Sequence, residues 1–443
     1  MSVVVFAWAA LRAEAQSTRR PDLNVFARAM RDPGQSLSVR ASMGANVYDR
    51  ITPPPVLPGS PLSPDHGWGT IASASLSYNV NLGAFTFDGS TGAFVTYYPD
   101  RADEFRTVVV PGGGVGVGWT WPVRRRTTLT FSSSLRHRPL SVESTVPLSG
   151  QIPRSLDVYD DPTLLFIPRD LEFVQGGYLT ARSNVSVTHE LTRRWVLLGD
   201  YGAQRDFSFN ALSAQYGVWS QYARANVGYN ILRTLRVRGG YRYEESHFKN
   251  ALKPYRYNTL EVAVDFGDSA TLRLTKRTTL TLDGGVGSFA DAAGGTRLHL
   301  TGRALLQHQM GRTWSADLGF NRGLDSGFLL FQAPTLTDTA SAIVSGLLTR
   351  ELGFHALATA QRGAVGVIGA GTGIVRITGN AGLQMSLGSR LALGVDYIYY
   401  KFKFEQGVAR PIGVPPLSSS QGLSVHLSTW APLYQRRRSN VTR

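Results

Sequence analysis

The stretch TLRVRGGYRYE, residues 234–244, alternates between two kinds of residue at nearly every position. Leu235, Val237 and Tyr241 belong to one set, and charged residues such as Arg236 belong to the other. Successive side chains of a β-strand point to opposite sides of the sheet, so the stretch is predicted to be a strand with one apolar and one basic face. Such a strand needs an apolar environment on one side and water on the other.

The same alternation recurs along the chain, for example over residues 297–307 and 375–386. It is compatible with a soluble sandwich of two sheets or with a membrane barrel whose polar face lines the lumen. Strands of a sandwich are usually about 5–6 residues long, whereas a tilted membrane strand needs at least about 9–11. The long alternating segments of this chain therefore favour the barrel.

The predicted connections alternate strictly between short and long, which is the asymmetry of outer-membrane barrels, with tight periplasmic turns and longer outer loops. Short connections are predicted near residues 80–83, 122–125, 191–194, 231–233, 274–277, 310–311, 351–353 and 388–389. Longer ones are predicted near 49–67, 99–105, 139–172, 208–214, 249–256, 290–295, 326–338, 368–373 and 405–417. These divide the chain into about eighteen strands, with sixteen as the lower bound, and an even number places both termini in the periplasm.

Aromatic residues fall where strands meet connections, as in the two girdles of a membrane barrel. Those beside the short turns are Trp119, Trp121, Trp195, Tyr229 and Trp314, and those towards the long connections include Tyr243 and Tyr399. Basic residues gather in the same short turns, namely Arg124, Arg125, Arg126, Arg193, Arg194, Lys276, Arg277, Arg312 and Arg390. They suit lipid headgroup phosphates, to which long cationic side chains extend; the alternative is docking of an acidic periplasmic partner.

Composition and chain ends fit this interpretation. Charged residues are 17% of the chain, below the roughly 25% of soluble domains, and there is no cysteine. The net charge of +15 is spread along the chain rather than gathered in a patch, which argues against nucleic-acid binding. Residues 1–15 resemble a secretory signal peptide, although its usual positive start is missing. The expected organisation is this signal at 1–15, a periplasmic segment at 16–35, the barrel at 36–433 and a basic periplasmic tail at 434–443.

The strand phase predicts which side chains line the lumen. The basic candidates are Arg40, Arg136, Arg182, Arg224, Arg236, Arg238, Arg242, Arg297, Arg303 and Arg376; the acidic ones are Asp200, Glu244, Glu261, Asp265, Asp283, Asp317 and Asp396. The lumen is therefore polar, mixed in charge and modestly positive. Two interpretations stand: the basic excess favours anionic solutes, or the arginines pair with carboxylates across strands and stiffen the wall. Asp268 falls on the apolar face, so a bulge near Gly267 is expected.

Other segments suggest little chemistry. The segment 139–172 is the best candidate for a constricting or receptor loop, and three nearby carboxylates within it, Asp157, Asp160 and Asp161, are more simply solvated than metal-bound. The run PGGGVGVG, residues 111–118, matches no phosphate-binding spacing and lies in a strand pattern. No cofactor, metal or catalytic residue is predicted. A hydrolase would need a lumen histidine within hydrogen-bond reach of a serine or aspartate.

Taken together, residues 36–433 resemble the large porin-like outer-membrane barrels of Gram-negative bacteria, including ones associated with exopolysaccharide export. The resemblance rests on the architecture and the arginine-bearing turns, and no functional residue carries over from it. It implies an outer-membrane conduit for hydrophilic solutes, anions among them, or for exported polysaccharide. The alternative is a non-conducting surface-binding or assembly barrel acting through its outer loops. The expected partners are outer-membrane lipids, solutes or polysaccharide in the lumen, the barrel assembly machinery and a periplasmic partner.

Overall fold

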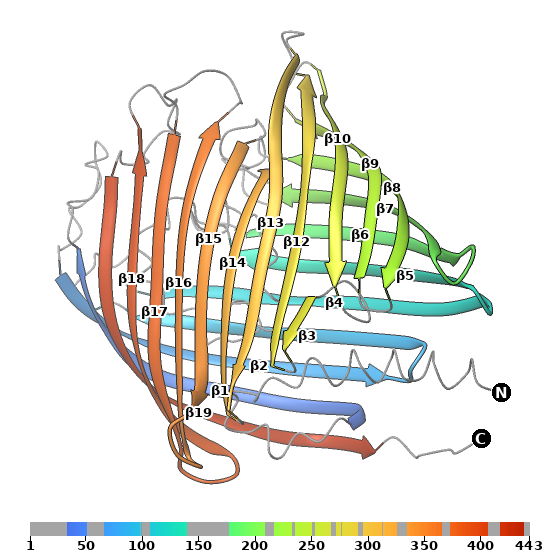
Figure 1. Ribbon diagram of the computed structural model, residues 1–443. Helices are drawn as coiled ribbons and strands as arrows, with labels where there is room; N and C mark the ends of the chain where they lie inside the picture. The colour runs from blue at the N-terminus through green and yellow to red at the C-terminus, as the bar shows by residue number, and fades with distance from the viewer. Residues whose placement is uncertain are drawn as a thin grey trace.

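The computed structural model describes residues 33–50, 66–97, 99, 107–139, 177–208, 217–232, 235–249, 253–266, 272–275, 277–290, 296–311, 313–325, 335–365, 373–405 and 417–437. Every regular element in these residues is a β-strand (Figure 1). The strands are β1 (Pro33–Arg50), β2 (His66–Asn81), β3 (Phe85–Tyr97), β4 (Thr107–Arg124), β5 (Thr127–Pro139), β6 (Gly177–Glu190), β7 (Trp195–Ser208), β8 (Val218–Leu232), β9 (Leu235–Phe248), β10 (Tyr255–Phe266), β11 (Leu272–Thr275), β12 (Thr278–Ala290), β13 (Thr296–Met310), β14 (Trp314–Asp325), β15 (Thr335–Leu347), β16 (Leu352–Val365), β17 (Gly373–Ser386), β18 (Leu391–Phe404) and β19 (Leu417–Arg437).

The strands form one closed, up-and-down antiparallel sheet. Each strand of the ring pairs with its neighbours in the sequence, and the first and last close the ring, with Ala45 opposite Val425. In Figure 1 the strands of the front wall, such as β13 and β16, run across those of the rear wall, such as β2 and β3. This crossing is expected when strands tilt by about 45° to the barrel axis, because opposite walls then tilt in opposite directions. The predicted all-β barrel is confirmed.

Eighteen strands make the ring, and β11 does not add to it. The pairing of β10 with β12 ends at Val264 opposite Leu282, and β11 continues along the same edge of β12 with Leu272 opposite Leu280. β10 and β11 thus share one strand position in the ring, and a break in the pairing with β12 separates them. The expected bulge at Gly267 and the misplaced Asp268 fall in this break, outside the described residues.

The connections alternate as predicted. The strands on one side are joined by short turns, for example 125–126 between β4 and β5 and 387–390 between β17 and β18. Gly311 in the β13–β14 turn has a φ of 68°, a left-handed conformation that costs glycine little. On the other side β1 ends at Arg50 and β2 begins only at His66. Hereafter the two ends are the short-turn end and the long-connection end.

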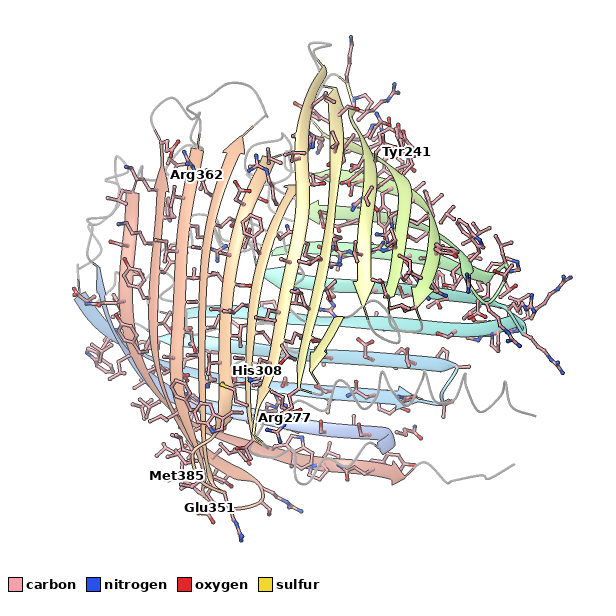
Figure 2. All side chains as sticks on the ribbon, viewed as in Figure 1. Tyr241, Arg277, His308, Glu351, Arg362 and Met385 are labelled. Carbon is pink, nitrogen blue, oxygen red and sulfur yellow. The ribbon has the colours of Figure 1, made fainter. Side chains whose placement is uncertain are left out.

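The outer face is apolar in its middle. Leu298 and Leu260 are 76% and 66% exposed, and other outward side chains alternate with them along the strands, including Met43, Val47, Val262, Leu300 and Leu318. A single-layer barrel with such a band needs hydrocarbon around it, because water would face the whole band. The protein is therefore a membrane-spanning barrel of the outer-membrane type. Figure 2 shows Arg277 and Glu351 at the short-turn end and Arg362 towards the long-connection end.

The strands extend a few residues beyond the predicted barrel bounds of 36–433 at both ends. β1 begins at Pro33, and β19 continues past Leu433 to Arg437, which pairs with Pro33. The segment 434–437, predicted as part of a free tail, is thus strand. The expected signal at 1–15 and the loop 139–172, apart from Pro139, lie outside the described residues.

Candidate functional site: the lumen wall

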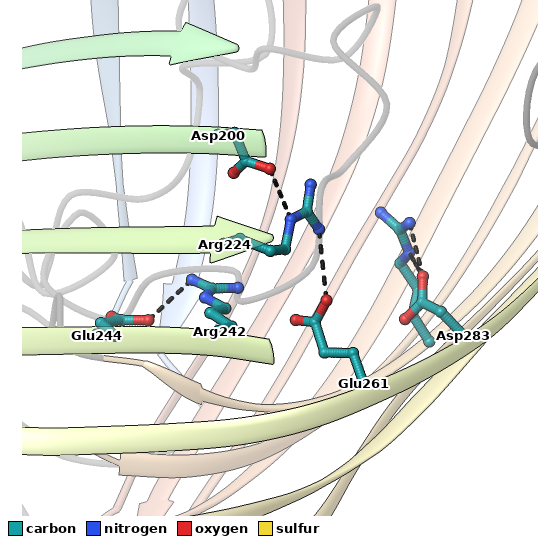
Figure 3. A network of polar contacts seen from close by, with 7 residues as sticks. Asp200, Arg224, Arg242, Glu244, Glu261 and Asp283 are labelled. Carbon is teal, nitrogen blue, oxygen red and sulfur yellow. Dashed lines mark hydrogen bonds and ion pairs between the residues drawn. The ribbon is translucent and has the colours of Figure 1, made fainter. Parts of the chain in front are cut away.

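The inward faces of β7, β8, β9, β10, β12 and β13 form a wall of ion pairs, here called the charged wall (Figure 3). Arg224 on β8 lies at its centre: its Nε donates to Asp200 Oδ1 at 2.7 Å, and its Nη1 lies 3.8 Å from Glu261 Oε2. Asp200 is directly opposite Arg224 in the strand register, whereas Glu261 is two strands away. One arginine on β8 therefore links β7 to β10 across the intervening strand β9.

Two further pairs extend this wall. Arg242 Nη2 lies 2.8 Å from Glu244 Oε2, and the guanidinium is 5.0 Å from the centre of the Tyr222 ring. Arg303 and Asp283, opposite each other on β13 and β12, are joined at 2.7 Å. The side chains of Arg224, Arg242 and Arg303 are 34%, 35% and 32% exposed, so water reaches them although they are paired.

Neutral side chains complete the charged wall and extend it to β6. Arg182 on β6 donates to Gln204 Oε1, Gln204 donates to Asp206, and Asn184 donates to the Tyr222 hydroxyl at 2.6 Å. At the short-turn end Arg236 donates to Asn230 at 2.7 Å. Arg182 and Arg236 therefore contact amides rather than carboxylates in these bonds, and their positive charge is not neutralised by them.

The opposite side of the lumen is different. The inward faces of β15, β16, β17, β18 and β19, here called the covered wall, contain many side chains that are shielded from water. Their shielded side chains are mainly hydroxyl-bearing, aromatic or apolar: Thr335, Thr337, Thr339, Thr359, Gln361, Ile374, Arg376, Ile398, Tyr400, Phe402, Phe404, Ser424, Ser428 and Trp430. These side chains are therefore less exposed to water than the paired arginines of the charged wall.

A buried carboxylate ties the covered wall together. Asp396 on β18 lies 3.0 Å from His355 Nε2 on β16 through one oxygen and 3.3 Å from His426 Nδ1 on β19 through the other. A Cβ on Gly382 would clash with Asp396 and His355, and one on Gly394 would clash with the His426 ring, so two glycines make the space for this cluster. The contact that the sequence set as a condition for a hydrolase is present. Asp396 and His426 are each 2% exposed, whereas His355 is 24% exposed, so water reaches this cluster from the His355 side.

The remaining predicted lumen residues are placed as follows. Arg40 on β1, Arg238 on β9, Asp317 on β14 and Arg376 on β17 lie on inward faces, and Arg376 stands over the Tyr400 ring at 5.6 Å. Asp265 and Arg297 lie in β10 and β13 with inward phase, but their side chains are outside the description. Sequence reasoning missed Tyr222, Gln204 and Asn184, because it followed charges only; the same alternation would have included these neutral polar residues.

The predicted aromatic and basic residues lie at the short-turn end where they are described. Trp119 and Trp121 are each 54% exposed on the outer face and stack on one another. Trp195 contacts Tyr229, whose hydroxyl accepts a hydrogen bond from Arg194, and Trp314 donates to the Leu347 carbonyl. Also exposed in the short turns are Arg124, Arg125, Arg126, Arg193, Arg277 and Arg390, while Lys276 and Arg312 lie outside the described residues. Tyr243 and Tyr399 have outward phase on β9 and β18.

The described residues contain no helix that is long and apolar enough to span a membrane. They contain no group of three His, Cys, Asp or Glu side chains arranged to hold a metal ion. The carboxylates Asp157, Asp160 and Asp161 lie outside this part of the chain.

Comparison with known proteins gives only distant structural likenesses. No family model matches the chain, and no curated protein matches it. Solved structures that resemble it include Pseudomonas aeruginosa OccK7 (OpdD), at 12% identity and a TM-score of 0.42, covering 90% of this chain and 100% of that one. OpdQ of the same organism has 10% identity and a TM-score of 0.41, covering 90% and 98%, and OprD has 10% and 0.38, covering 90% and 96%. The assignment to the outer membrane rests on the barrel's own closure and apolar band.

Proposed function

We propose that the protein is a passive conduit for small hydrophilic solutes across the outer membrane. The charged wall supports this proposal, because its paired arginines remain about one-third exposed and their carboxylate partners are 12% to 27% exposed. An eighteen-stranded ring is too wide for its own side chains to fill, so a water-filled interior is expected wherever the wall is not covered. The covered wall narrows that interior, which favours small solutes over a polysaccharide chain.

Within this proposal, small anions pass more readily than cations. The paired arginines contribute little net field, since Arg224 alone faces two carboxylates. Arg182 and Arg236 instead bond to amides; Arg236 lies at the short-turn end of β9, and Arg182 lies near the middle of β6. Cations along the lumen wall raise the local concentration of anions. A modest anion preference follows, because the ion pairs themselves are close to neutral.

Planar-bilayer recording of the refolded chain tests the conduit. We expect stepwise increases of conductance. In a salt gradient, we expect the reversal potential to shift towards the equilibrium potential of the anion. The double variant Arg182→Gln, Arg236→Gln removes that shift without closing the pore. Arg277→Gln, a turn arginine that the sequence places at the periplasmic boundary, is the control and leaves it unchanged. A correctly folded barrel that inserts without conducting contradicts the proposal.

A second candidate function is supported by the covered wall. If the rest of the lumen is shielded as this wall is, the barrel does not conduct and acts through its outer surface, as a binding or assembly barrel. The buried Asp396 cluster does not distinguish the two, because a stiff wall serves either. Passage of a small sugar into proteoliposomes discriminates them: uptake supports the conduit, and its absence in folded protein supports the binding barrel.

A further inference from the structure

The outer face of β6 to β10 carries a groove within the apolar band. Its volume is about 720 Å³, and its floor is made by three small residues, Gly199, Ala225 and Gly239. Leu197, Val227, Tyr241 and Leu260 stand around it, each at least 38% exposed. A Cβ on Gly199 or Gly239 would have only one backbone oxygen within 4 Å. The groove thus exists because its glycines carry no side chains. Its apolar lining is the kind that an acyl chain requires.

A polar cluster lies on the same strands, on the same outer face, nearer the long-connection end. Glu245 is at its centre: Gln221 and Arg256 donate to its two oxygens at 3.2 and 3.4 Å, and His247 Nε2 lies 3.5 Å away. Trp219 contacts the His247 ring at 5.0 Å between centroids. Arg256 is 60% exposed, so its guanidinium is available to a further anion.

The charge of this cluster is positive. Arg205 on β7 is exposed and stands over the Phe207 ring at 4.6 Å. Lys249 and Lys253 are exposed at the end of β9 and just before β10. With Arg256 these are four cations against the single carboxylate of Glu245, in the described residues of this outer face. Positive charge next to a membrane surface attracts anionic lipid headgroups.

The spacing of cluster and groove matches an amphiphile. Arg256 and Leu260 are on the same face of β10, four positions apart, which is about 13 Å along a strand. Between them Tyr241 donates a hydrogen bond to Asn258, and Tyr201 donates one to Gln221 at 3.0 Å. From the long-connection end towards the middle of the strands, the surface therefore carries first cations, then hydroxyl and amide groups, and then apolar side chains. A lipid has the same order from phosphate through glycerol or sugar to acyl chain.

We propose that this surface of β6 to β10 binds lipid A, a phosphorylated glycolipid, with its phosphates at Arg205 and Arg256 and one acyl chain in the groove. The choice of a glycolipid rests on width. Arg205 and Arg256 are on strands three places apart, which is about 14 Å, and a disaccharide with a phosphate at each end spans a comparable distance. A single glycerophosphate does not. The cluster also lies at the long-connection end, which faces the outer leaflet.

Titration of the full chain in detergent with lipid A, read by native mass spectrometry, tests the headgroup contacts. We expect the double variant Arg205→Gln, Arg256→Gln to weaken the affinity for lipid A at least about tenfold. Each basic residue beside an anionic lipid raises the affinity about fivefold. The control is Arg362→Gln, an outward arginine of β16 that is 71% exposed and faces Glu405 instead. Equal binding by the two variants overturns the proposal.

The groove is tested separately. Gly239→Leu fills it without a clash in the wall, and we expect lipid A binding to fall while the thermal unfolding of the barrel is unchanged. Gly379→Leu is the matched control, since Gly379 has outward phase on β17 and equally open space around its Cβ. Unchanged binding in Gly239→Leu overturns the groove assignment. Binding of phosphatidylglycerol as tight as that of lipid A overturns the choice of a glycolipid.

Discussion

The charged wall and the covered wall are built from the same alternating pattern, yet the charged side chains at their centres differ in exposure. Arg224 and Arg242 are about one-third exposed, whereas Asp396 and His426 are 2% exposed. A pair in contact with water is screened and contributes little to stability, whereas a buried charge depends on its partners. The comparison indicates that ion pairs of the same kind have different roles: under the proposed function the hydrated pairs line the passage, whereas the buried cluster contributes rigidity.

The largest effect is expected from breaking the buried cluster. Asp396→Asn removes the charge that faces both His355 and His426, and we expect the free energy of unfolding to fall by about 3 kcal/mol. Asp283→Asn, whose partner Arg303 stays hydrated, should cost less than about 1 kcal/mol. Urea titration in lipid vesicles, followed by tryptophan fluorescence, measures both. Equal losses would remove the distinction between the walls.

A somewhat smaller loss is expected from the glycines that make room for this cluster. Gly382→Ala places a methyl group against Asp396 and His355, and overpacking of this kind costs about 1–3 kcal/mol. Gly284→Ala on β12 is the matched control, because its Cβ would lie 3.6 Å from the Thr301 oxygen in ordinary contact. The same unfolding titration compares them, and a stable Gly382→Ala would show that the cluster has room to move.

Selectivity should respond only on the charged wall. Arg224→Gln leaves Asp200 and Glu261 without their shared cation, so we expect the reversal potential in a salt gradient to move towards the cation. Arg376→Gln removes an arginine charge from the covered wall. Because Arg376 is only 5% exposed, we expect no shift of the reversal potential. Bilayer recording of both proteins measures this. A shift in Arg376→Gln would place the passage against the covered wall instead.

The smallest effect is expected outside the barrel. Arg362 and Glu405 form a pair at 3.4 Å on the outer face at the long-connection end, and Arg362 is largely exposed. Arg362→Ala should change the free energy of unfolding by less than about 1 kcal/mol. A loss comparable to that of Asp396→Asn would mean that surface pairs, rather than the covered wall, hold the ring together.

The two-residue alternation predicted an inward position for many charged side chains. It did not predict which of the inward faces are shielded from water. Arg224, Glu261 and Asp283 were assigned inward from alternation alone, because a slip by one residue would put their charges into lipid at about 2–4 kcal/mol per basic residue near the midplane. The pairing of Arg224 with Glu261, two strands away, was not predictable, because alternation gives no register between strands. The proposed anion preference depends on that register, since it decides which arginines are neutralised.

The end of β18 shows where local pattern misleads. In YKFKF, residues 400–404, the residue types taken alone would put the aromatic residues on the lipid face and the lysines in the lumen. The inward phase predicted for Asp396 gives the opposite arrangement, and it is the one observed: Phe402 and Phe404 point inward and are buried, and Lys403 is exposed on the outer side. The half of β18 nearer the short-turn end has Val395 outward and Asp396 inward, and this fixes the phase for the whole strand. A lysine at the long-connection end also lies near headgroups, where its charge is tolerated.

The sequence by itself determined the class of fold, the approximate number of strands, the alternation of short and long connections and the inward face of strands with a clear alternation, such as β9. These follow from the two-residue period of a strand and the cost of charge in hydrocarbon, both of which are local. Only the tertiary structure decided which arginines meet carboxylates, which wall is covered and that a groove lies beneath a cationic cluster on β6 to β10. These depend on register and ring closure, which bring residues such as Ala45 and Val425 together from opposite ends of the chain.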